Sequence, residues 1–230
     1  MERLLEGVSK FQKEVFPEHR ELFERLSTKQ TPMALFVTCA DSRVVPSLIT
    51  QTDPGDLFIC RNVGNMIPPY GEIQGGVSST IEYAVSALGV KHVIVCGHTD
   101  CGAMKGVLHP ENCESMPTVK QWLAMGEVAR RVVLDTRSDL PEKELMHMLI
   151  QENVVAQLAH LRTHPSVASS LARGNLTVHG WVYHIVTGAL EAWDAQRGRF
   201  VPIEQYRPES AASPARLQTL AETFSELKAS

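Results

Sequence analysis

The sequence predicts an α/β fold in which helices flank a central, mostly parallel β-sheet, with a projecting N-terminal helical arm and a late antiparallel or edge extension of the sheet. Three observations predict it. Residues 33–39, 56–62 and 91–98 are short and almost continuously apolar, as strands buried on both faces are. Residues 75–90, between the second and third runs, predict a helix and therefore a strand–helix–strand crossover. Strand patterns return only near the end of the chain, in residues 175–203.

The first thirty residues predict an amphipathic helix. Leu4, Leu5, Val8 and Phe11 recur at spacings of three and four residues, which places them on one helical face. This face has no obvious apolar partner within its own domain. We therefore expect the helix to lie across a second subunit.

The middle of the chain is mainly helical. The helix over residues 75–90 is opened by glycines and serines and ends at Gly89, a plausible C-terminal cap. The helical pattern then continues through residues 117–133 and 141–174, until Gly174 ends it.

The last elements are strands and a tail. Residues 175–193 predict two strands joined near Thr187 and Gly188, and residues 199–203 predict a further edge strand. The tail from Glu209 onward predicts either a weak last helix or a frayed end. We expect one domain, 1–230, with three parts: an N-terminal arm (1–30), a core (31–205) and a C-terminal tail (206–230).

Composition excludes several classes of protein. A chain of 230 residues with 43% hydrophobic content is long enough for one substantial core. The net charge is −4 and no block of lysine and arginine occurs, so we expect no nucleic-acid partner. Neither a signal-peptide pattern nor an apolar run of roughly 18 residues is present, so we expect no membrane association and a cytoplasmic location. Five cysteines, an odd number, favour reduced thiols over a disulfide framework.

Two of the predicted strands end in metal-ligand residues. Cys39 ends the first strand and His98 ends the third, and Cys101 follows three residues later. The carboxyl ends of neighbouring parallel strands meet at one edge of a sheet, so these side chains can converge. Two thiolates and one imidazole suit zinc and leave a fourth position open. The remaining cysteines fit this site poorly, because they lie inside strand patterns or in a later loop: Cys60, Cys96 and Cys113.

Asp41 and Arg43 follow Cys39 at alternate positions. A carboxylate beside the metal can only accept hydrogen bonds, so Asp41 would orient a proton-bearing group there, and the planar guanidinium of Arg43 would keep Asp41 from binding the metal itself. Two rival interpretations remain. Asp41 could instead be a fourth ligand of a non-catalytic zinc module, or it could be only a cap for the next helix. Redox use of the cysteines ranks third, since no Cys-x-x-Cys occurs.

The motifs "CADSRV" and "GHTDCGAM" together resemble those of the β-class carbonic anhydrases. The resemblance extends through "PGDLFICRNVGNMIPPYG", "GGVSSTIEYAV", "ENVVAQL" and "HGWVY", and is strongest to the bacterial cyanate-operon type. It implies a lyase that hydrates carbon dioxide reversibly to bicarbonate and a proton, by attack of zinc-bound hydroxide on carbon dioxide. It also implies one zinc ion per subunit and a homodimer or homotetramer.

The resemblance implies a role for each residue of the site. It makes Cys39, His98 and Cys101 the zinc ligands and Asp41 and Arg43 the dyad beside the metal. It also implies a set of substrate-binding residues, of which Gly102 acts through its backbone amide: Gln30, Phe58, Val63, Tyr83 and Gly102.

One position departs from part of this family. Members with a second, inhibitory bicarbonate site carry a tryptophan where this chain has Phe36, although Arg61 and Tyr183 match the other residues of that site. We therefore expect the uninhibited type. His179, in "VHGWVY", is predicted to be structural and to bond within the late strands.

Overall fold

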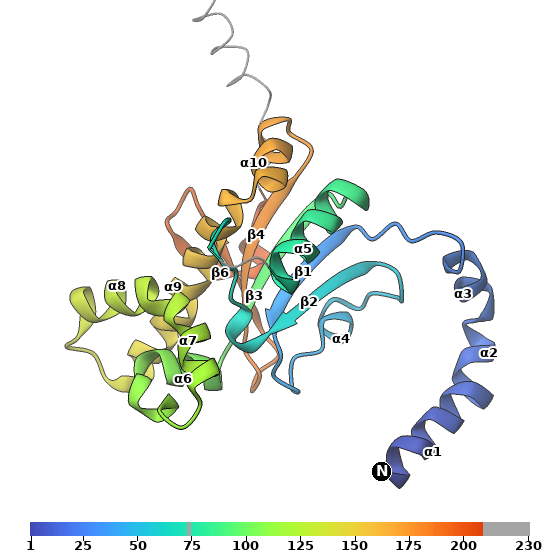
Figure 1. Ribbon diagram of the computed structural model, residues 1–230, viewed down its shortest axis with the longest axis horizontal. Helices are drawn as coiled ribbons and strands as arrows, with labels where there is room; N and C mark the ends of the chain where they lie inside the picture. Colours follow the sequence, from blue (N-terminus) through green and yellow to red (C-terminus); the bar gives the residue numbers. More distant parts are fainter. Residues whose placement is uncertain (73–74, 209–230) are drawn as a thin grey trace, which may run out of the picture.

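The computed structural model describes residues 1–72 and 75–208, and in these residues six strands form one sheet in the order β2-β1-β3-β4-β5-β6 (Figure 1). The four strands β1 to β4 run parallel, and the last two add antiparallel neighbours. The predicted α/β fold with a late antiparallel extension is therefore confirmed. The strand bounds are β1 (Ala34–Cys39), β2 (Leu57–Asn62), β3 (His92–His98), β4 (Thr177–Tyr183), β5 (Leu190–Asp194) and β6 (Arg199–Pro202).

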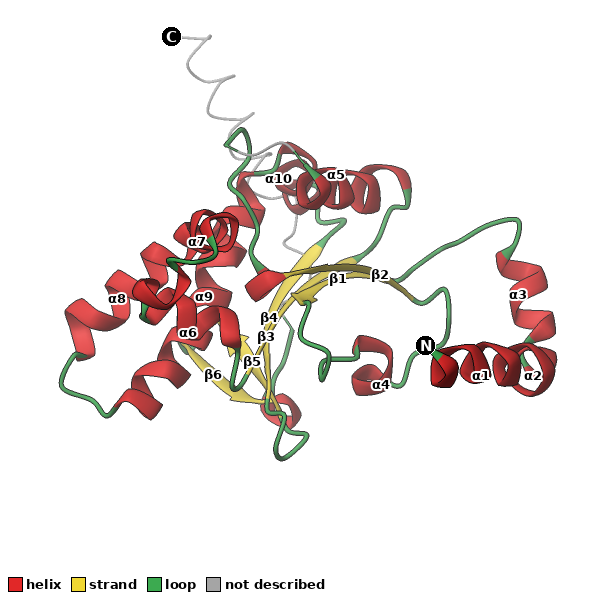
Figure 2. Ribbon diagram, turned by 60° about the horizontal axis from the view of Figure 1, so that its bottom comes forward, coloured by secondary structure: helices red, strands yellow, loops and turns green. Residues whose placement is uncertain are grey.

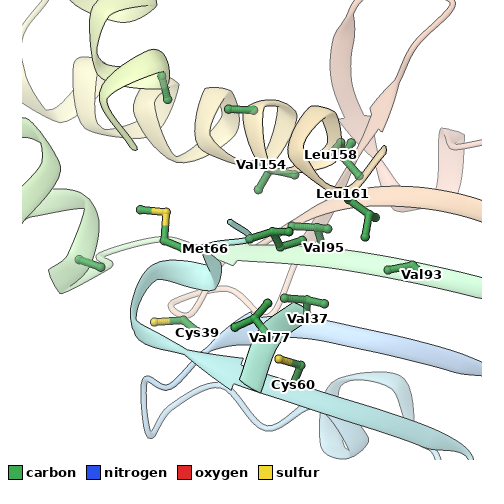
Figure 3. Packing of buried hydrophobic residues seen from close by; sticks show 14 of the residues in the cluster. Val37, Cys39, Cys60, Met66, Val77, Val93, Val95, Val154, Leu158 and Leu161 are labelled. Carbon is green, nitrogen blue, oxygen red and sulfur yellow. The ribbon is translucent and has the colours of Figure 1, made fainter. Parts of the chain in front are cut away.

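The two faces of the sheet carry different clusters because side chains alternate along each strand. Leu35 and Val37 of β1 belong to the main core, in which Val154 and Leu158 of the long helix α9 (Glu142–Thr163) pack over the sheet (Figure 3). Phe36, one residue out of phase, belongs to a smaller cluster on the opposite face. Figure 2 shows α5, α9 and α10 on one side of the sheet and α4 on the other.

Two of the predicted helical stretches are broken. The stretch 117–133 divides at a 3₁₀ turn, Ala124–Gly126, and close packing requires glycine at its end, because a Cβ atom on Gly126 would lie 2.8 Å from a methyl group of Val107. The stretch 141–174 divides at His164, which adopts an extended conformation because Pro165 follows it. The helices of the core are α4 (Pro46–Thr50), α5 (Gly76–Glu82) with a π-helical turn (Tyr83–Ala87), α6 (Gly102–Leu108), α7 (Pro117–Leu123), α8 (Glu127–Arg137), α9 and α10 (Pro165–Ala172). Short 3₁₀ turns occur at Val63–Asn65, Pro110–Cys113, Ala124–Gly126 and Ile203–Gln205.

The N-terminal arm consists of α1 (Glu2–Lys10), a π-helical turn (Phe11–Val15), α2 (Phe16–Glu18) and α3 (Arg20–Leu26). It projects away from the sheet, as Figure 1 shows, and none of these residues is buried. Leu4 and Leu5 are 67% and 63% exposed. The predicted N-terminal helix is present, and its apolar face has no cover within one chain.

The late strands agree with the sequence in detail. β4 and β5 are joined by a turn that contains Gly188 at a φ of 74°, a conformation that favours glycine. Gly89, which has a φ of 67°, follows the π-helical turn as the predicted cap. The predicted tail from Glu209 lies outside the described residues. Within the described ranges, no helix is both long and apolar enough to span a membrane.

Candidate metal centre

Neighbouring parallel strands bring the first two candidate ligands together. β1 and β3 pair directly, so Cys39 at the end of β1 and His98 at the end of β3 reach the same edge of the sheet. Cys101 lies three residues further, at the N-terminus of α6. The candidate ligand atoms of the three side chains all lie within 4.8 Å of one another, and all three residues are buried. The sequence-predicted convergence is therefore present.

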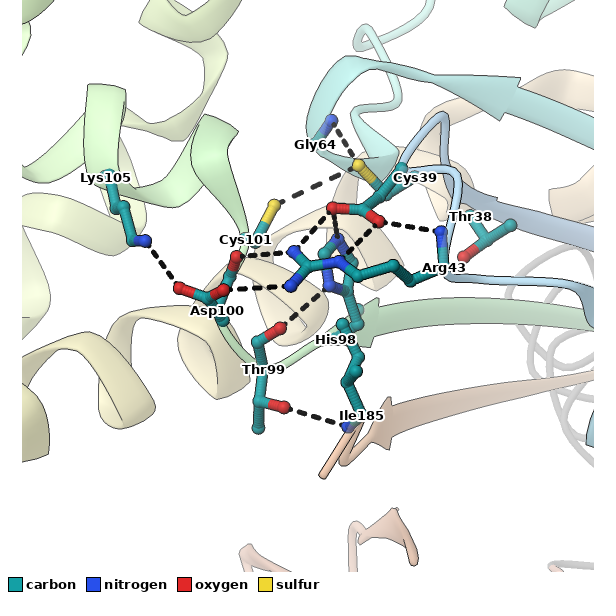
Figure 4. Close-up of polar contacts among 12 residues, drawn as sticks. Thr38, Cys39, Arg43, Gly64, His98, Thr99, Asp100, Cys101, Lys105 and Ile185 are labelled. Carbon is teal, nitrogen blue, oxygen red and sulfur yellow. Dashed lines mark hydrogen bonds and ion pairs between the residues drawn. The ribbon is translucent and has the colours of Figure 1, made fainter. Parts of the chain in front are cut away.

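The imidazole of His98 is oriented for a ligand. Its Nδ1 lies 2.9 Å from the carbonyl oxygen of Thr99, which can only accept, so Nδ1 donates and Nε2 carries the lone pair (Figure 4). Nε2 is buried and has no hydrogen-bond partner. A buried, unpaired acceptor is costly, and a cation at this position would remove the cost.

The two thiols complete the ligand set. The Sγ atoms of Cys39 and Cys101 are 4.0 Å apart, and the backbone N–H of Gly64 donates to Cys39 Sγ at 3.4 Å. The hydrogen bond from Cys101 lowers the pKa of Cys39, whereas the thiolate so formed, together with burial, raises the pKa of Cys101. A divalent cation would favour ionisation of both. Two sulfurs and one nitrogen in this arrangement fit zinc.

Asp41 and Arg43 form a bidentate pair beside these ligands. Arg43 Nε donates to Asp41 Oδ1 at 3.0 Å and Arg43 Nη2 to Asp41 Oδ2 at 2.9 Å, while the backbone N–H of Arg43 also donates to Oδ1. The Arg43 guanidinium holds the pKa of the Asp41 carboxyl well below its usual range. Asp41 Oδ2 lies 3.9 Å from His98 Nε2, so the carboxylate borders the ligand cluster but faces the arginine.

Sequence reasoning missed two charged residues at this site. Arg43 Nη1 donates to Asp100 Oδ2 at 2.9 Å, and Lys105 Nζ donates to Asp100 Oδ1 at 2.5 Å. Asp100 immediately precedes Cys101, so its position next to a predicted ligand was the available signal. The contact with Arg43 was not visible in sequence, because 57 residues separate them.

The other cysteines lie apart from the ligand cluster. Cys96 is fully buried on the opposite face of the sheet, where burial raises the pKa of its thiol to about 12. Burial also raises the pKa of Cys60. All five cysteines are free thiols, in agreement with the prediction against a disulfide framework.

The predicted substrate-binding residues are only partly assembled in one chain. The rings of Phe58 and Tyr83 lie 5.9 Å apart, and Val63 precedes the glycine that donates to Cys39. Tyr83 and Val63 are about half exposed. Gly102 is the first residue of α6, directly after Cys101, and Gln30 is exposed in the segment between the arm and β1.

Arg61 and Phe36 have structural contacts of their own. Arg61 donates to the carbonyl oxygens of Cys39 and Asp41 at 3.1 and 2.6 Å, so it supports the loop that carries the dyad. The ring of Phe36 packs edge-on against Trp181 at 6.0 Å. The absence of a second bicarbonate site stays a prediction.

Comparison with known proteins identifies relatives over most of the chain. A family model described as carbonic anhydrase matches residues 34–190. A carbonic anhydrase of Synechocystis is 46% identical over 219 residues, which span 93% of this chain and 80% of the relative. Carbonic anhydrase 1 of Escherichia coli is 46% identical over 223 residues, or 96% of this chain and all of the relative.

Solved structures show the same fold. The β-carbonic anhydrase CcaA superposes with a TM-score of 0.88 at 46% identity, and the match covers 94% of this chain and 96% of that protein. A tetrameric β-carbonic anhydrase of Sordaria macrospora superposes with a TM-score of 0.76 at 28% identity, covering 83% of this chain and 95% of that protein.

Proposed function

Since this chain belongs to the β-class carbonic anhydrases, we propose that it hydrates carbon dioxide reversibly to bicarbonate and a proton at a zinc site held by Cys39, His98 and Cys101. The observation that carries this assignment is the convergence of three buried ligand atoms within 4.8 Å, one of which, His98 Nε2, has no other partner. When bound, zinc would supply a Lewis acid that lowers the pKa of a water molecule, though less strongly with two thiolate ligands than with three imidazoles.

The dyad orients the attacking oxygen. Asp41 Oδ2 accepts one hydrogen bond from Arg43 and retains lone pairs on the side of His98, so it can accept a hydrogen bond from a water molecule or hydroxide there. This contact points the oxygen lone pair toward carbon dioxide. Arg43 contributes indirectly, because its bidentate contact keeps the Asp41 carboxylate from turning toward the ligands.

The remaining residues bind the substrate. Phe58, Val63 and Tyr83 offer an apolar wall for carbon dioxide, and their partial exposure leaves room for residues of a second subunit. The backbone N–H of Gly102, at the N-terminus of α6, can donate to a bicarbonate oxygen. Gln30 would complete the site after assembly, because in one chain it stays exposed.

Metal analysis combined with an activity assay tests this function. We expect one zinc ion per chain, carbon dioxide hydration by the zinc-loaded protein, loss of that activity with a chelator, and recovery on addition of zinc. A zinc-loaded protein that does not hydrate carbon dioxide would reject the proposal.

A non-catalytic zinc module is the second candidate, and it requires Asp41 as the fourth ligand. The distance of 3.9 Å between Asp41 Oδ2 and His98 Nε2 makes this geometrically accessible. The three hydrogen bonds that Arg43 makes to Asp41 oppose it. X-ray absorption of the zinc-loaded protein distinguishes the two, because the module has two sulfur, one imidazole and one carboxylate ligand and no solvent ligand.

We further propose that the arm binds a second copy of this chain, in a homodimer or homotetramer. The exposed apolar residues of α1 are unsuited to a free helix in water. On the sheet face opposite α9, a groove of about 840 Å³ near the start of β1 and β3 is lined by both apolar and polar residues but has a mostly apolar surface. Light scattering should give a dimer or larger for the native chain and a smaller mass for a Leu4→Glu, Leu5→Glu variant.

The cyanate-operon subtype and the cytoplasmic location stay proposals that rest on the sequence. A deletion strain that grows poorly only when cyanate is supplied would support the subtype. Normal growth on cyanate, with a requirement for added carbon dioxide instead, would reject it.

A further inference from the structure

Arg43 makes more contacts than a surface ion pair needs. Its side chain is 44% exposed, and it lies in the loop between β1 and α4. Exposed ion pairs are usually weak, because two side chains must be ordered in water. Arg43 nevertheless donates to two different carboxylates, so its guanidinium plane is fixed from both sides.

Asp100 provides the second side with two acceptors. Its carboxylate accepts from Arg43 Nη1 at 2.9 Å and its carbonyl oxygen accepts from Arg43 Nη2 at 3.2 Å. Asp100 has a φ of 57°, a left-handed conformation that only a few per cent of non-glycine residues adopt. This conformation accompanies the presentation of both acceptors to one guanidinium.

Lys105 completes the arrangement from α6. Its Nζ donates at 2.5 Å to Asp100 Oδ1, the oxygen that Arg43 does not use. Asp41, Arg43, Asp100 and Lys105 therefore form a row of alternating charges, drawn in Figure 4 for the labelled Arg43, Asp100 and Lys105. The contacts from Lys105 and Arg43 lower the pKa of Asp100.

We propose that Asp100 and Lys105 are positioning residues for the reaction, which hold Arg43 so that Asp41 faces the arginine and not the metal. The proposal rests on the proposed function. Asp100 adjoins Cys101 in sequence, so it links the loop that carries a metal ligand to the loop that carries the dyad. Without this link, the side chain of Asp41 alone would hold the guanidinium. The Asp41 carboxylate, whose Oδ2 lies 3.9 Å from His98 Nε2, would then turn toward the ligand cluster more readily.

Asp100→Asn and Lys105→Met test the proposal in the zinc- and cobalt-loaded protein. Asparagine tolerates the left-handed backbone, so the first variant changes charge without straining the loop. The reference is Arg43→Ala, which removes the contact that the two residues support. The matched control is Lys120→Met, because Lys120 Nζ also donates at 2.5 Å to a carboxylate, that of Glu114, on an exposed surface outside the site.

Loss of positioning should appear in kcat and in the cobalt spectrum. We expect Asp100→Asn to lower kcat about fivefold, because the amide keeps an acceptor for Arg43 but lacks the charge that pairs with it. KM should change less than kcat, and the protein should still bind one metal ion per chain. The visible absorption spectrum of the cobalt-loaded variant should become more like that of cobalt-loaded Arg43→Ala. Lys105→Met should lower kcat by about two- to threefold and shift the cobalt spectrum in the same direction. Lys105→Arg, which keeps the charge, should have a native kcat and a native spectrum.

A double variant separates positioning from independent effects. Asp100→Asn combined with Arg43→Ala should be no slower than Arg43→Ala alone, because both changes act through the same guanidinium. Additive losses, a loss of metal from Asp100→Asn, or single variants that behave like Lys120→Met would each overturn the proposal. If the native zinc-loaded protein does not hydrate carbon dioxide, the proposed function fails, and the cobalt spectra still decide whether Asp100 positions Arg43.

Discussion

His98 and His179 are buried histidines on the neighbouring strands β3 and β4, but they lie toward opposite ends of the sheet and differ in their hydrogen bonds. Both ring nitrogens of His179 are satisfied, Nε2 by Thr177 Oγ1 at 2.7 Å and Nδ1 by the hydroxyl of Tyr206 at 2.8 Å. Only Nδ1 of His98 is satisfied, and its Nε2 faces two thiols and a carboxylate. Burial alone therefore does not identify a candidate ligand, whereas a buried acceptor nitrogen without a hydrogen-bond partner that also lies among two thiols does.

Replacing each of the two histidines by glutamine should reveal the largest difference between them. His98→Gln replaces the proposed zinc-binding nitrogen by an amide, so we expect loss of bound metal and a fall in carbon dioxide hydration on the order of a thousandfold or more. His179→Gln retains the capacity for hydrogen bonding and should keep one zinc and near-native kcat. Zinc content and hydration rate, measured on both variants, check this. Equal loss of metal from both variants would show that His98 and His179 do not differ in metal binding.

Asp41→Asn should have the next largest effect. The amide has nearly the shape of the carboxylate but lacks its charge and has one acceptor oxygen instead of two, so it accepts a hydrogen bond less strongly and loses the bidentate ion pair with Arg43. We expect a fall in kcat of about a hundredfold with metal content unchanged. Loss of zinc from this variant would instead make Asp41 a ligand and support the non-catalytic module.

The sequence predicted which candidate ligands converge but not the residues that contact them. Cys39, His98 and Cys101 could be found because each lies at or just after the end of a strand, and parallel strands align their ends. Asp100 and Gly64 contact the site through loop conformations with positive φ, at 57° and 81°. Local patterns of hydrophobicity contain no information on such loop geometry.

One of the two helix breaks was visible in the sequence, because Pro165 follows His164, whereas the turn at Ala124–Gly126 was not. Gly126, at the end of this turn, packs against Val107 of another helix, which occupies the space that a side chain would need. That contact is tertiary, so the helical periodicity on either side could not show it. The arm is the opposite case, since its exposed apolar spacing was visible in sequence and is uncovered in the chain.

Low pH should reduce the stability of the folded chain through His179. Burial, followed by the nearby His92, lowers the pKa of His179 to about 4, below its ordinary value of 6.5. The unfolded chain therefore binds more protons between these values. As a result, the free energy of unfolding is not reduced by His179 above pH 6.5. It falls by up to about 3 kcal/mol as the pH decreases toward 4. Urea unfolding at several pH values should show this slope in the native chain and a shallower one in His179→Gln. The same pH dependence of the unfolding free energy in both proteins would show that His179 is not responsible for it.

A third histidine, on the surface, should show the smallest effect. His109 lies just after α6, about 12 Å along that helix from Cys101, and its two nitrogens lie 3.3 Å from carboxylate oxygens of Glu111 and Glu142. Its side chain is 38% exposed, so these pairs should contribute well under about 1 kcal/mol to stability. We expect His109→Ala to retain full metal content and to change kcat less than about twofold. A larger fall in kcat that added imidazole buffer restores would show that His109 carries protons out of the site, since only a proton-transfer step can be rescued by a diffusing base. In that case a histidine with both nitrogens paired would be functional after all, and hydrogen-bond satisfaction would separate structural from functional histidines only in the buried part of the sheet.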